Sequence, residues 1–275
     1  MECRKAPEER GLTVPPIFDA SLCTGCGLCS RICVFGCISP SDDGLPSVPD
    51  GAACTGCGHC VAVCPAGAVS LPEAGTSPVA PSAGTGTAEA LGGYMRSRRS
   101  IRHYLERPVD RRLFEEVFEI VRFAPTAVNR QPVAWTIVHD TGKVRALTAL
   151  AADWLRETAG EDPLYRTFLD AWERGSDLIC HGAPHLVVAH APADDPLAPR
   201  DAAIACAHLD LALPAFGLGG CWAGLFTAAA ASHPPLAEAL RLPDGHRPLG
   251  TLLVGYARYR YASVPPRKRP ATRWL

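Results

Sequence analysis

The pattern of apolar and polar positions divides the chain into a short first part and a longer second part. Residues 12–70 carry scattered apolar side chains among many cysteines, without a periodic apolar core. Residues 71–87 are rich in Pro, Gly, Ser, Thr and Ala, which is typical of a linker. From 88 onward, apolar residues recur with the periods of helices and strands. The pattern therefore predicts a small module at 12–70, a linker at 71–87 and a larger domain at 88–275.

Capping residues and apolar stripes locate the first helices of the larger domain. Thr87 is expected to cap a helix that ends at Arg98, and Asp110 to cap the next one. Apolar residues at helical spacing along 113–121 form the stripe of this second helix. Because proline cannot continue a helix, Pro125 is expected to stop it.

The rest of the larger domain alternates β-rich runs with helical patterns. Asp140, followed by Thr and Gly, is expected to end the first strand. A sheet flanked by helices follows from this alternation, so the fold class is α+β. The expected strands are 133–138, 185–191 and 249–256, and the expected helices are 144–155, 164–172 and 201–216, the last with a kink near Pro214.

Two cysteine runs dominate the first part of the chain. Each has the spacing C-x2-C-x2-C-x3-C; Pro65 follows the second run, whereas Val34 follows the first. Three closely spaced thiolates on a tight loop can wrap an iron–sulfur cluster, and the fourth thiolate comes from elsewhere. The two runs are Cys23, Cys26, Cys29 and Cys33, and Cys54, Cys57, Cys60 and Cys64.

The double run resembles that of bacterial two-cluster ferredoxins, which implies a small ferredoxin-like βαβ repeat and two [4Fe–4S] clusters. In such chains the fourth cysteine of each run binds the other run's cluster. The module is then expected to depend on its clusters for stability, because its apolar core is small. The implied ligand sets are Cys23, Cys26, Cys29 and Cys64 for one cluster, and Cys54, Cys57, Cys60 and Cys33 for the other.

Structural zinc and disulfide bonds are the alternative uses of these cysteines. Zinc sites more often show two separated cysteine pairs with a longer spacer. Disulfides suit secreted proteins, and the charged stretch at residues 1–11 does not have the apolar core expected of a signal peptide. Cys37 is an extra thiol near the first run, which we interpret as a small buried residue rather than an alternative ligand.

The charge balance narrows the choice of partners. The formal net charge of −1 at pH 7 argues against nucleic acid or an anionic membrane surface as a partner. Residues 1–80 hold eight acidic and four basic residues, which would suit either a basic redox partner or a solvated face. No uncharged apolar stretch has the length needed to cross a membrane. Thiolate-bound clusters favour a reducing, cytoplasmic location.

Charged and amide side chains alternate in two segments of the larger domain. If residues 99–104 are extended, Arg98, Ser100 and Arg102 face the same way and suit a phosphate and a ribityl chain, or form a basic surface strip. Asn129 and Gln131 alternate in the same manner between two prolines. Their carboxamides match the mixed donor and acceptor edge of a flavin ring, or cap the loop.

Two further stretches contain glycine or basic residues. The run GLGGCWAG at 217–224 is not a dinucleotide fingerprint, because a helical pattern precedes it and no acidic residue follows at the right distance. Its glycines suggest a tight turn or a close approach of the backbone to a flat ligand. Arg267, Lys268 and Arg269 form a basic cluster between prolines, suited to a phosphate or to solvent.

The motifs RRSIRHY, RFAPTAVNRQPVAW and GLGGCWAG, followed by a Gly-Tyr strand and a basic Pro-rich tail, resemble the FMN-dependent nitroreductase family from about Tyr94 to Arg269. With the cysteine runs, the chain resembles the ferredoxin–nitroreductase fusions. The resemblance implies an α+β homodimer with one FMN in each of two sites at the subunit interface. It assigns Arg98, Arg99, Ser100 and Arg102 to the phosphate and ribityl chain, Pro125, Thr126, Ala127, Asn129 and Gln131 to the isoalloxazine from the partner subunit, Ala223 and Gly224 to the vicinity of the ring, and Arg267 and Arg269 to the phosphate.

This fusion implies an oxidoreductase. Electrons from a ferredoxin-type or other low-potential donor would pass singly through two [4Fe–4S] clusters to FMN, which collects two and delivers a hydride to a conjugated electrophile such as a nitroaromatic or a quinone. The alternatives are a non-catalytic electron-transfer or redox-sensing subunit, and another flavin reaction on the same fold, such as reductive dehalogenation. No acid or base is assigned; the candidates by residue type, each interpreted as structural, are His103, His181, His185 and His208.

Overall fold

The structure is a computed structural model that describes residues 15–40, 44–49, 54–72 and 87–275. Most of the expected linker and all of the charged stretch at residues 1–11 lie outside these residues. The chain divides into two compact units, one made mainly of residues up to 85 and one that holds nearly all residues from 86 onward. No helix among the described residues has the length and apolar character to cross a membrane.

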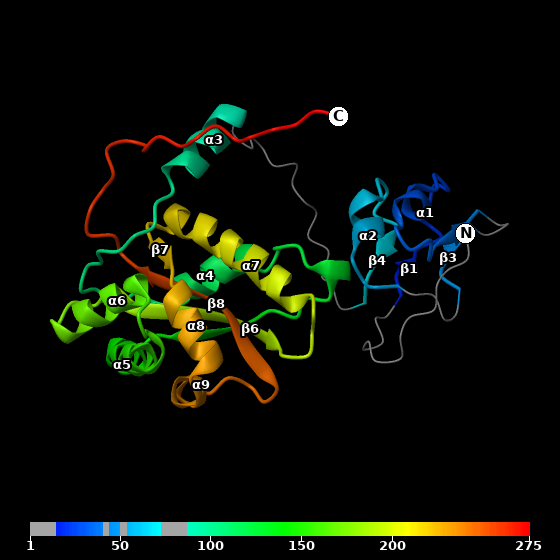
Figure 1. Ribbon diagram of the computed structural model, residues 1–275. Coiled ribbons are helices and arrows are strands. Elements are labelled where there is room, and N and C mark those ends of the chain that lie inside the picture. Colours follow the sequence, from blue (N-terminus) through cyan, green and yellow to red (C-terminus); the bar gives the residue numbers. More distant parts are fainter. Residues whose placement is uncertain (1–14, 41–43, 50–53, 73–86) are drawn as a thin grey trace. The chain divides into compact units, whose positions relative to one another are not determined.

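The first unit consists of two βαβ halves, as the ferredoxin resemblance implied (Figure 1). The outer strands β1 and β4 pair with each other, and so do the inner strands β2 and β3, in both cases antiparallel. In chain order its elements are β1 (Ile17–Phe18), α1 (Leu28–Ile32), β2 (Ser39–Pro40), β3 (Pro46–Ser47), α2 (His59–Val63) and β4 (Val69–Ser70).

The second unit is built on a four-stranded sheet with the order β5-β6-β8-β7, in which every neighbouring pair is antiparallel. The two central strands pair over their whole length, with an irregularity between Ala189 and His190. The strands are β5 (Ala134–Val138), β6 (His185–Pro192), β7 (Gly219–Trp222) and β8 (His246–Gly255).

Helices cover both faces of this sheet (Figure 1). Leu186 and Val188 of β6 pack with α5, α6, α8 and α9, whereas Val187 and Ala189 pack with α4 and α7. Because both faces are covered, β6 is buried from His185 to Ala191, and residues 186–189 form an apolar run. The helices are α3 (Ala88–Ser97), α4 (Arg111–Val121), α5 (Thr141–Thr158), α6 (Pro163–Glu173), α7 (Ala198–Ala212), α8 (Gly224–Ser232) and α9 (Pro234–Leu240), with short 3₁₀ turns η1 (Ala127–Asn129) and η2 (Leu213–Phe216).

The structure confirms the capping residues that were expected for two helices. The Thr87 hydroxyl accepts a hydrogen bond from the Ala90 N–H at 3.3 Å and caps α3. The Asp110 carboxylate accepts from the Arg112 N–H at 2.8 Å and caps α4. The end of α4 differs: the helix ends at Val121, and the chain tightens into turns closed by the hydrogen bonds from the Phe123 and Ala124 N–H groups to the carbonyls three residues earlier, before it reaches Pro125.

Other boundaries were wrong or missed. Asp140 does follow the strand, but it also caps α5 by accepting from the Lys143 N–H at 2.6 Å, so this helix begins before the expected start at 144. The expected kink near Pro214 is a change from α7 to η2 after Ala212. Strand β7 and helices α8 and α9 were not expected.

Candidate functional site

The two cysteine runs fold almost identically. The glycine before each helix is left-handed, with φ of 67° at Gly27 and 75° at Gly58. Cys33 and Cys64, the fourth cysteine of each run, follow the helices with nearly the same backbone angles, φ −70° and ψ 103° against φ −72° and ψ 111°. Each position of the first run therefore has a structural equivalent in the second.

A cavity of about 100 Å³ lies beside the first run. Its lining includes three cysteines of the first run together with Cys64, the last cysteine of the second run. This is the combination that the ferredoxin resemblance implied for one cluster. The four cysteines in the lining are Cys23, Cys26, Cys29 and Cys64.

Backbone N–H groups point at the fourth cysteine of each run. The Cys37 N–H donates to the sulfur of Cys33 at 3.2 Å, and the Ala68 N–H donates to the sulfur of Cys64 at 3.3 Å. Such bonds stabilise a thiolate, the form in which cysteine binds metal. Cys37 is itself buried at the position equivalent to Ala68, so its thiol occupies a small enclosed site, as we interpreted it.

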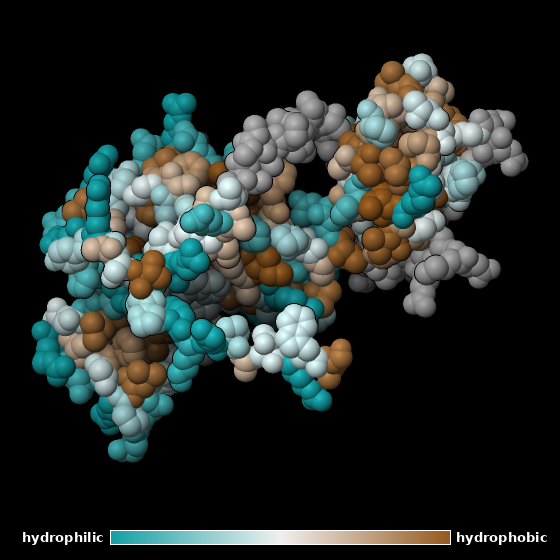
Figure 2. Space-filling view, turned by 90° about the horizontal axis from the view of Figure 1, so that it is seen from above, coloured by the Kyte–Doolittle hydropathy of each residue, from teal (hydrophilic) through white to brown (hydrophobic). Residues whose placement is uncertain are grey.

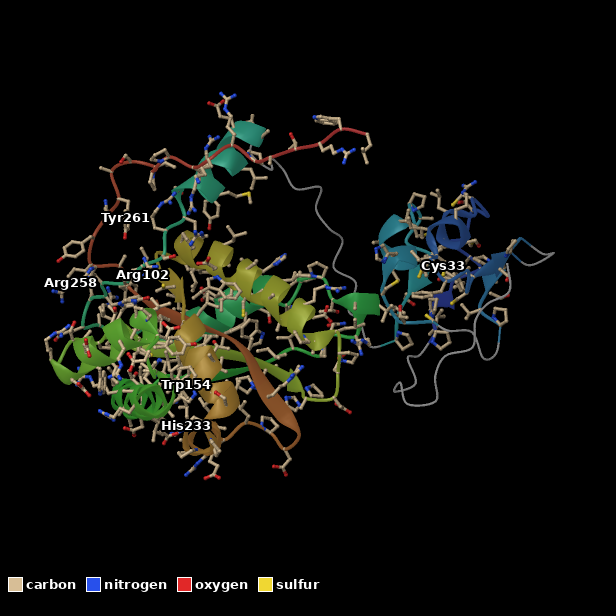
Figure 3. All side chains as sticks on the ribbon, viewed as in Figure 1. Cys33, Arg102, Trp154, His233, Arg258 and Tyr261 are labelled. Carbon is tan, nitrogen blue, oxygen red and sulfur yellow. The ribbon has the colours of Figure 1, made fainter. Side chains whose placement is uncertain are left out.

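The donors in the lining of the cavity are all thiols, as an iron–sulfur cluster requires. Within the described ranges, no three His, Cys, Asp or Glu side chains lie close enough together to hold one metal ion. A four-iron cluster is wider than an ion, so its thiolates surround a cavity instead of meeting at a point. Figure 3 shows the sulfurs around Cys33 in the first unit. The residues present therefore fit an iron–sulfur cluster.

In the second unit, the segment after α3 presents alternate side chains to Cys221 of β7. The Ser100 hydroxyl hydrogen-bonds to the Cys221 thiol, and Arg98 and Arg102 lie near enough to influence it. Burial raises the pKa of this thiol, and these neighbours oppose the rise. Ser100, Arg98 and Arg102 therefore all lie near this thiol. Arg99 instead donates to the carbonyl of Arg96.

Arg98 is held by an aspartate that the sequence reasoning missed. Its guanidinium lies 3.2 Å from the carboxylate of Asp210 on α7. Burial raises the pKa of Asp210, while Arg98 and a hydrogen bond from the side chain of Trp222 oppose that rise. The only sequence signal for Asp210 was an acidic residue between two leucines of an apolar helix.

The segment that was expected to carry Asn129 and Gln131 on one extended face is a tight turn. Val128, Asn129 and Gln131 have φ of 48°, 55° and 50°, in the left-handed region that non-glycine residues rarely adopt. The Gln131 N–H donates to the Thr126 hydroxyl at 3.0 Å, which closes the turn. The alternation of Asn129 and Gln131 in the sequence therefore does not place their carboxamides on one face of a strand.

A buried aspartate holds the start of this turn. The Asp201 carboxylate accepts from the Ala127 N–H at 3.0 Å and is only 1% exposed. Its second oxygen has no hydrogen-bond partner among the described residues. Sequence reasoning missed Asp201 because the turn and α7 are far apart in the chain. Pro125 precedes the turn and lies after α4.

The glycine-rich run forms an edge strand and a turn. A Cβ at Gly219 would lie 2.3 Å from Ile101, whose N–H donates to the Gly220 carbonyl at 2.9 Å. The close approach inferred for these glycines is therefore to the chain itself. Ala223 is buried and donates its N–H to the Thr251 carbonyl at 2.8 Å, and Gly224 begins α8.

Arg267 and Arg269 lie on the exposed C-terminal segment after β8, away from regular structure. The structure does not bring them to Ser100 or Arg102 by any hydrogen bond or ion pair. Earlier in the same segment, the Arg258 N–H donates to the His103 carbonyl at 2.9 Å.

The four histidines considered as acids or bases have structural surroundings. His185 is fully buried; its Nδ1 lies 2.8 Å from the His139 carbonyl and its Nε2 accepts from the Val109 N–H at 2.8 Å. Burial lowers the pKa of His185 to about 4 and also lowers that of His181. His208 bonds to a carbonyl of its own helix, and His103 packs edge-on against Tyr259.

Comparison with known proteins places both units in families. The sequence model described as "Nitroreductase family" matches residues 95–256, more than half of the chain. The model described as "4Fe-4S dicluster domain" matches residues 22–69.

Solved structures share the fold of the second unit. A nitroreductase with bound FMN from Desulfitobacterium hafniense has a TM-score of 0.58 at 23% identity, covering 69% of this chain and 100% of its own. A nitroreductase with bound FMN from Bacteroides fragilis has a TM-score of 0.56 at 22% identity, covering 67% and 96%. An FMN-dependent nitroreductase from Clostridium difficile has a TM-score of 0.54 at 16% identity, covering 66% and 97%.

The α+β fold class and the expected order of the two parts are thus confirmed. The prediction of an FMN-dependent oxidoreductase is confirmed at the level of the family. The chain belongs to the nitroreductase family and carries a 4Fe–4S dicluster domain in front of its nitroreductase domain.

Proposed function

We propose that this chain relays electrons from a low-potential donor, such as a ferredoxin-type protein, through two [4Fe–4S] clusters to FMN, and reduces a conjugated electrophile such as a nitroaromatic or a quinone. The observation that carries the proposal is the cavity whose lining combines Cys64 of the second run with three cysteines of the first run. In the chain, this unit precedes a nitroreductase-family domain. When bound, the clusters supply one-electron transfer and FMN supplies two-electron, hydride-transfer chemistry.

The cysteine thiolates of the first unit would hold the clusters. The first set lines the cavity, and the second set consists of Cys33, Cys54, Cys57 and Cys60. The backbone N–H bonds to Cys33 and Cys64 would stabilise the negative charge on these sulfurs.

Side chains of the second unit fit FMN. Ser100 and Arg102, which both lie near Cys221, would offer a hydroxyl and a guanidinium to the phosphate or the ribityl chain. Arg98 would act beside them while Asp210 holds it in place. The left-handed turn would present Thr126, Ala127 and Asn129 to the ring, and the unpartnered oxygen of Asp201 leaves a buried acceptor beside that turn. The remaining residues proposed for this site are Arg99, Pro125, Gln131, Ala223, Gly224, Arg267 and Arg269.

A homodimer is part of the proposal. Helix α3 buries none of its side chains within the chain, and Leu91 and Met95 on it are 59% and 51% exposed. Apolar side chains at such exposure favour a partner surface. A second copy of the chain over α3 would place residues of both copies around each flavin. Cluster thiolates also favour a reducing compartment, for which we propose the cytoplasm.

The proposal also includes the domain boundaries: a ferredoxin-like domain at 12–70, a linker at 71–87 and an FMN-binding domain at 88–275. Families match within the first and third of these ranges, at 22–69 and 95–256.

Anaerobic purification, followed by iron, sulfide and flavin counts and a donor screen, tests the proposal. We expect iron for two four-iron clusters and one FMN per chain, and turnover of a nitroaromatic or quinone with a reduced ferredoxin. Colourless protein, or protein that holds iron but no FMN, would overturn it. Failure to turn over any soluble acceptor would favour an electron carrier or sensor instead.

The variant Cys64→Ser tests the relay itself. We expect it to abolish turnover supported by ferredoxin while part of the turnover supported by dithionite remains, because a small reductant can reach the flavin directly. Equal loss with the two donors would contradict a relay through the clusters.

A further inference from the structure

The two cysteine runs differ in the residue that follows their third cysteine. Ser30 follows the third cysteine of the first run, and Val61 follows the third cysteine of the second. The backbones of Ser30 and Val61 form equivalent hydrogen bonds. In each run, the carbonyl of this residue accepts from the N–H of the fourth cysteine of the same run at 3.3 Å. The two halves therefore place a hydroxyl and an aliphatic side chain at equivalent sites.

The Ser30 hydroxyl lacks a partner within the chain. Its oxygen is buried and forms no hydrogen bond with any described residue. Ser30 also belongs to the lining of the cavity that contains Cys23, Cys26, Cys29 and Cys64. Leaving a buried hydroxyl without a hydrogen bond is destabilising, so such groups usually have a partner when the site is filled.

The other unpartnered hydroxyl of this unit does not distinguish the two halves. Thr55 also has a buried oxygen without a partner among the described residues. Thr55 follows the first cysteine of its run, and Thr24 stands at the equivalent position of the other. At the position after the third cysteine, the first run thus has the hydroxyl of Ser30 next to its cluster site, where the second run has the aliphatic Val61.

We propose that the Ser30 hydroxyl donates a hydrogen bond to a sulfur of the cluster held by Cys23, Cys26, Cys29 and Cys64, and thereby raises the reduction potential of this cluster. The inference rests on the proposed function, because it needs both clusters. Hydrogen bonds to cluster sulfurs help to set the potential. A donor stabilises the reduced state more than the oxidised one, since reduction adds one electron and makes the sulfurs more negative. Val61 offers no donor to the second cluster.

Redox titration of the anaerobic, full-length protein, followed by electron paramagnetic resonance, tests this inference. The wild-type protein is expected to show two midpoint potentials. Ser30→Ala should lower one of them and leave the other unchanged, whereas Ser30→Thr, which keeps the hydroxyl, should keep both. The mirror variant Val61→Ser should raise the potential that Ser30→Ala leaves unchanged. Ser47→Ala removes an exposed hydroxyl from β3, outside the cavity lining, and should shift neither.

Exchange into heavy water supplies a second readout. Electron–nuclear double resonance of the reduced wild-type protein should show an exchangeable deuteron in addition to those of the backbone N–H groups that donate to Cys33 and Cys64, and Ser30→Ala should lose it. If Ser30→Ala binds less iron, Val61→Ser decides the case, because it should gain one further exchangeable deuteron at the second cluster.

Full iron content in Ser30→Ala with both potentials unchanged would overturn the inference and leave the proposed function intact. An equal shift of both potentials would also overturn it, because a hydroxyl in one cavity acts on one cluster. Wild-type protein without iron would overturn the proposed function first, so the two failures are distinguishable.

Discussion

The two units of the chain bury apolar side chains to different extents. The second unit has two apolar clusters, one on each face of its sheet, with fully buried side chains such as Leu186, Leu252 and Phe226. In the described part of the first unit, the buried apolar side chains are small or few, among them Ile38, Val69 and the thiol of Cys37. Figure 2 shows apolar patches on the visible surface of the first unit.

The difference indicates two ways of stabilising a fold. Burial of each large aliphatic side chain contributes about 1.5–3 kcal/mol, so the second unit has a sufficient core of its own. A small domain without such a core usually needs metal or cross-links. We infer that the first unit depends on its inorganic groups, whereas the second folds without its flavin.

Removal of iron should have the largest effect. Anaerobic chelation of iron from the whole chain should unfold the first unit, because cluster binding and folding are one equilibrium there. Hydrogen exchange measured by mass spectrometry should show protection lost around α1 and α2 and kept in β6 and β8. If protection persists in the first unit after the iron is removed, this unit does not depend on its clusters for folding. Removal of flavin alone is the control.

Acid should weaken the second unit through His185. The pKa of His185 is lowered to about 4 in the folded protein, against an ordinary value near 6.5. Between these two pH values the unfolded chain therefore binds a proton at this residue more readily than the folded chain does. Stability from this group is fully present above about pH 6.5 and is lost as the pH falls to about 4, by up to about 3 kcal/mol.

Denaturant titrations between pH 4 and 7 measure this loss. His185→Gln should flatten the acid slope, and the exposed control His208→Gln should keep it. If His185→Gln loses stability with pH as steeply as the wild-type chain, this histidine does not cause the slope.

A methyl group at Gly255 should strain the core of the second unit. Its Cβ would lie 2.7 Å from Pro184 and 2.8 Å from the Tyr104 ring, neither of which can easily move. Gly255→Ala should destabilise the second unit by about 1–3 kcal/mol, measured by thermal or denaturant unfolding. Gly93→Ala on α3 meets no atom within 4 Å and should be neutral or slightly stabilising.

The smallest effect is expected at Asp201. Asp201→Ala removes the acceptor for the Ala127 N–H and should weaken FMN binding about tenfold, because the strained turn loses its anchor. Asp201→Asn keeps an oxygen acceptor and should bind nearly as well. Asp140→Ala removes a similar N–H acceptor at the cap of α5 and should leave FMN affinity unchanged.

Flavin titration followed by fluorescence measures these affinities. Wild-type affinity in a folded Asp201→Ala protein would show that the carboxylate does not position the turn.

Local signals predicted much of this fold. Thr87 and Asp110 were recognised because a helix cap and its N–H partner lie within three residues of each other. β7 was missed because glycine is rare in strands, and α8 was missed because its sequence, GLFTAAAAS, shows little contrast between its faces. The turn at 127–131 was misjudged because alternation alone does not reveal left-handed backbone angles.

By itself, the sequence determined the two cysteine runs, their equivalence and the order of the two families, because these depend on spacing within short segments. Only the tertiary structure decided that Asp210 holds Arg98, that Asp201 holds Ala127, and that the Ser30 hydroxyl is enclosed beside Cys64. These contacts join residues distant in the chain, and their geometry exists only after the sheet, the helices and the two cysteine runs have packed.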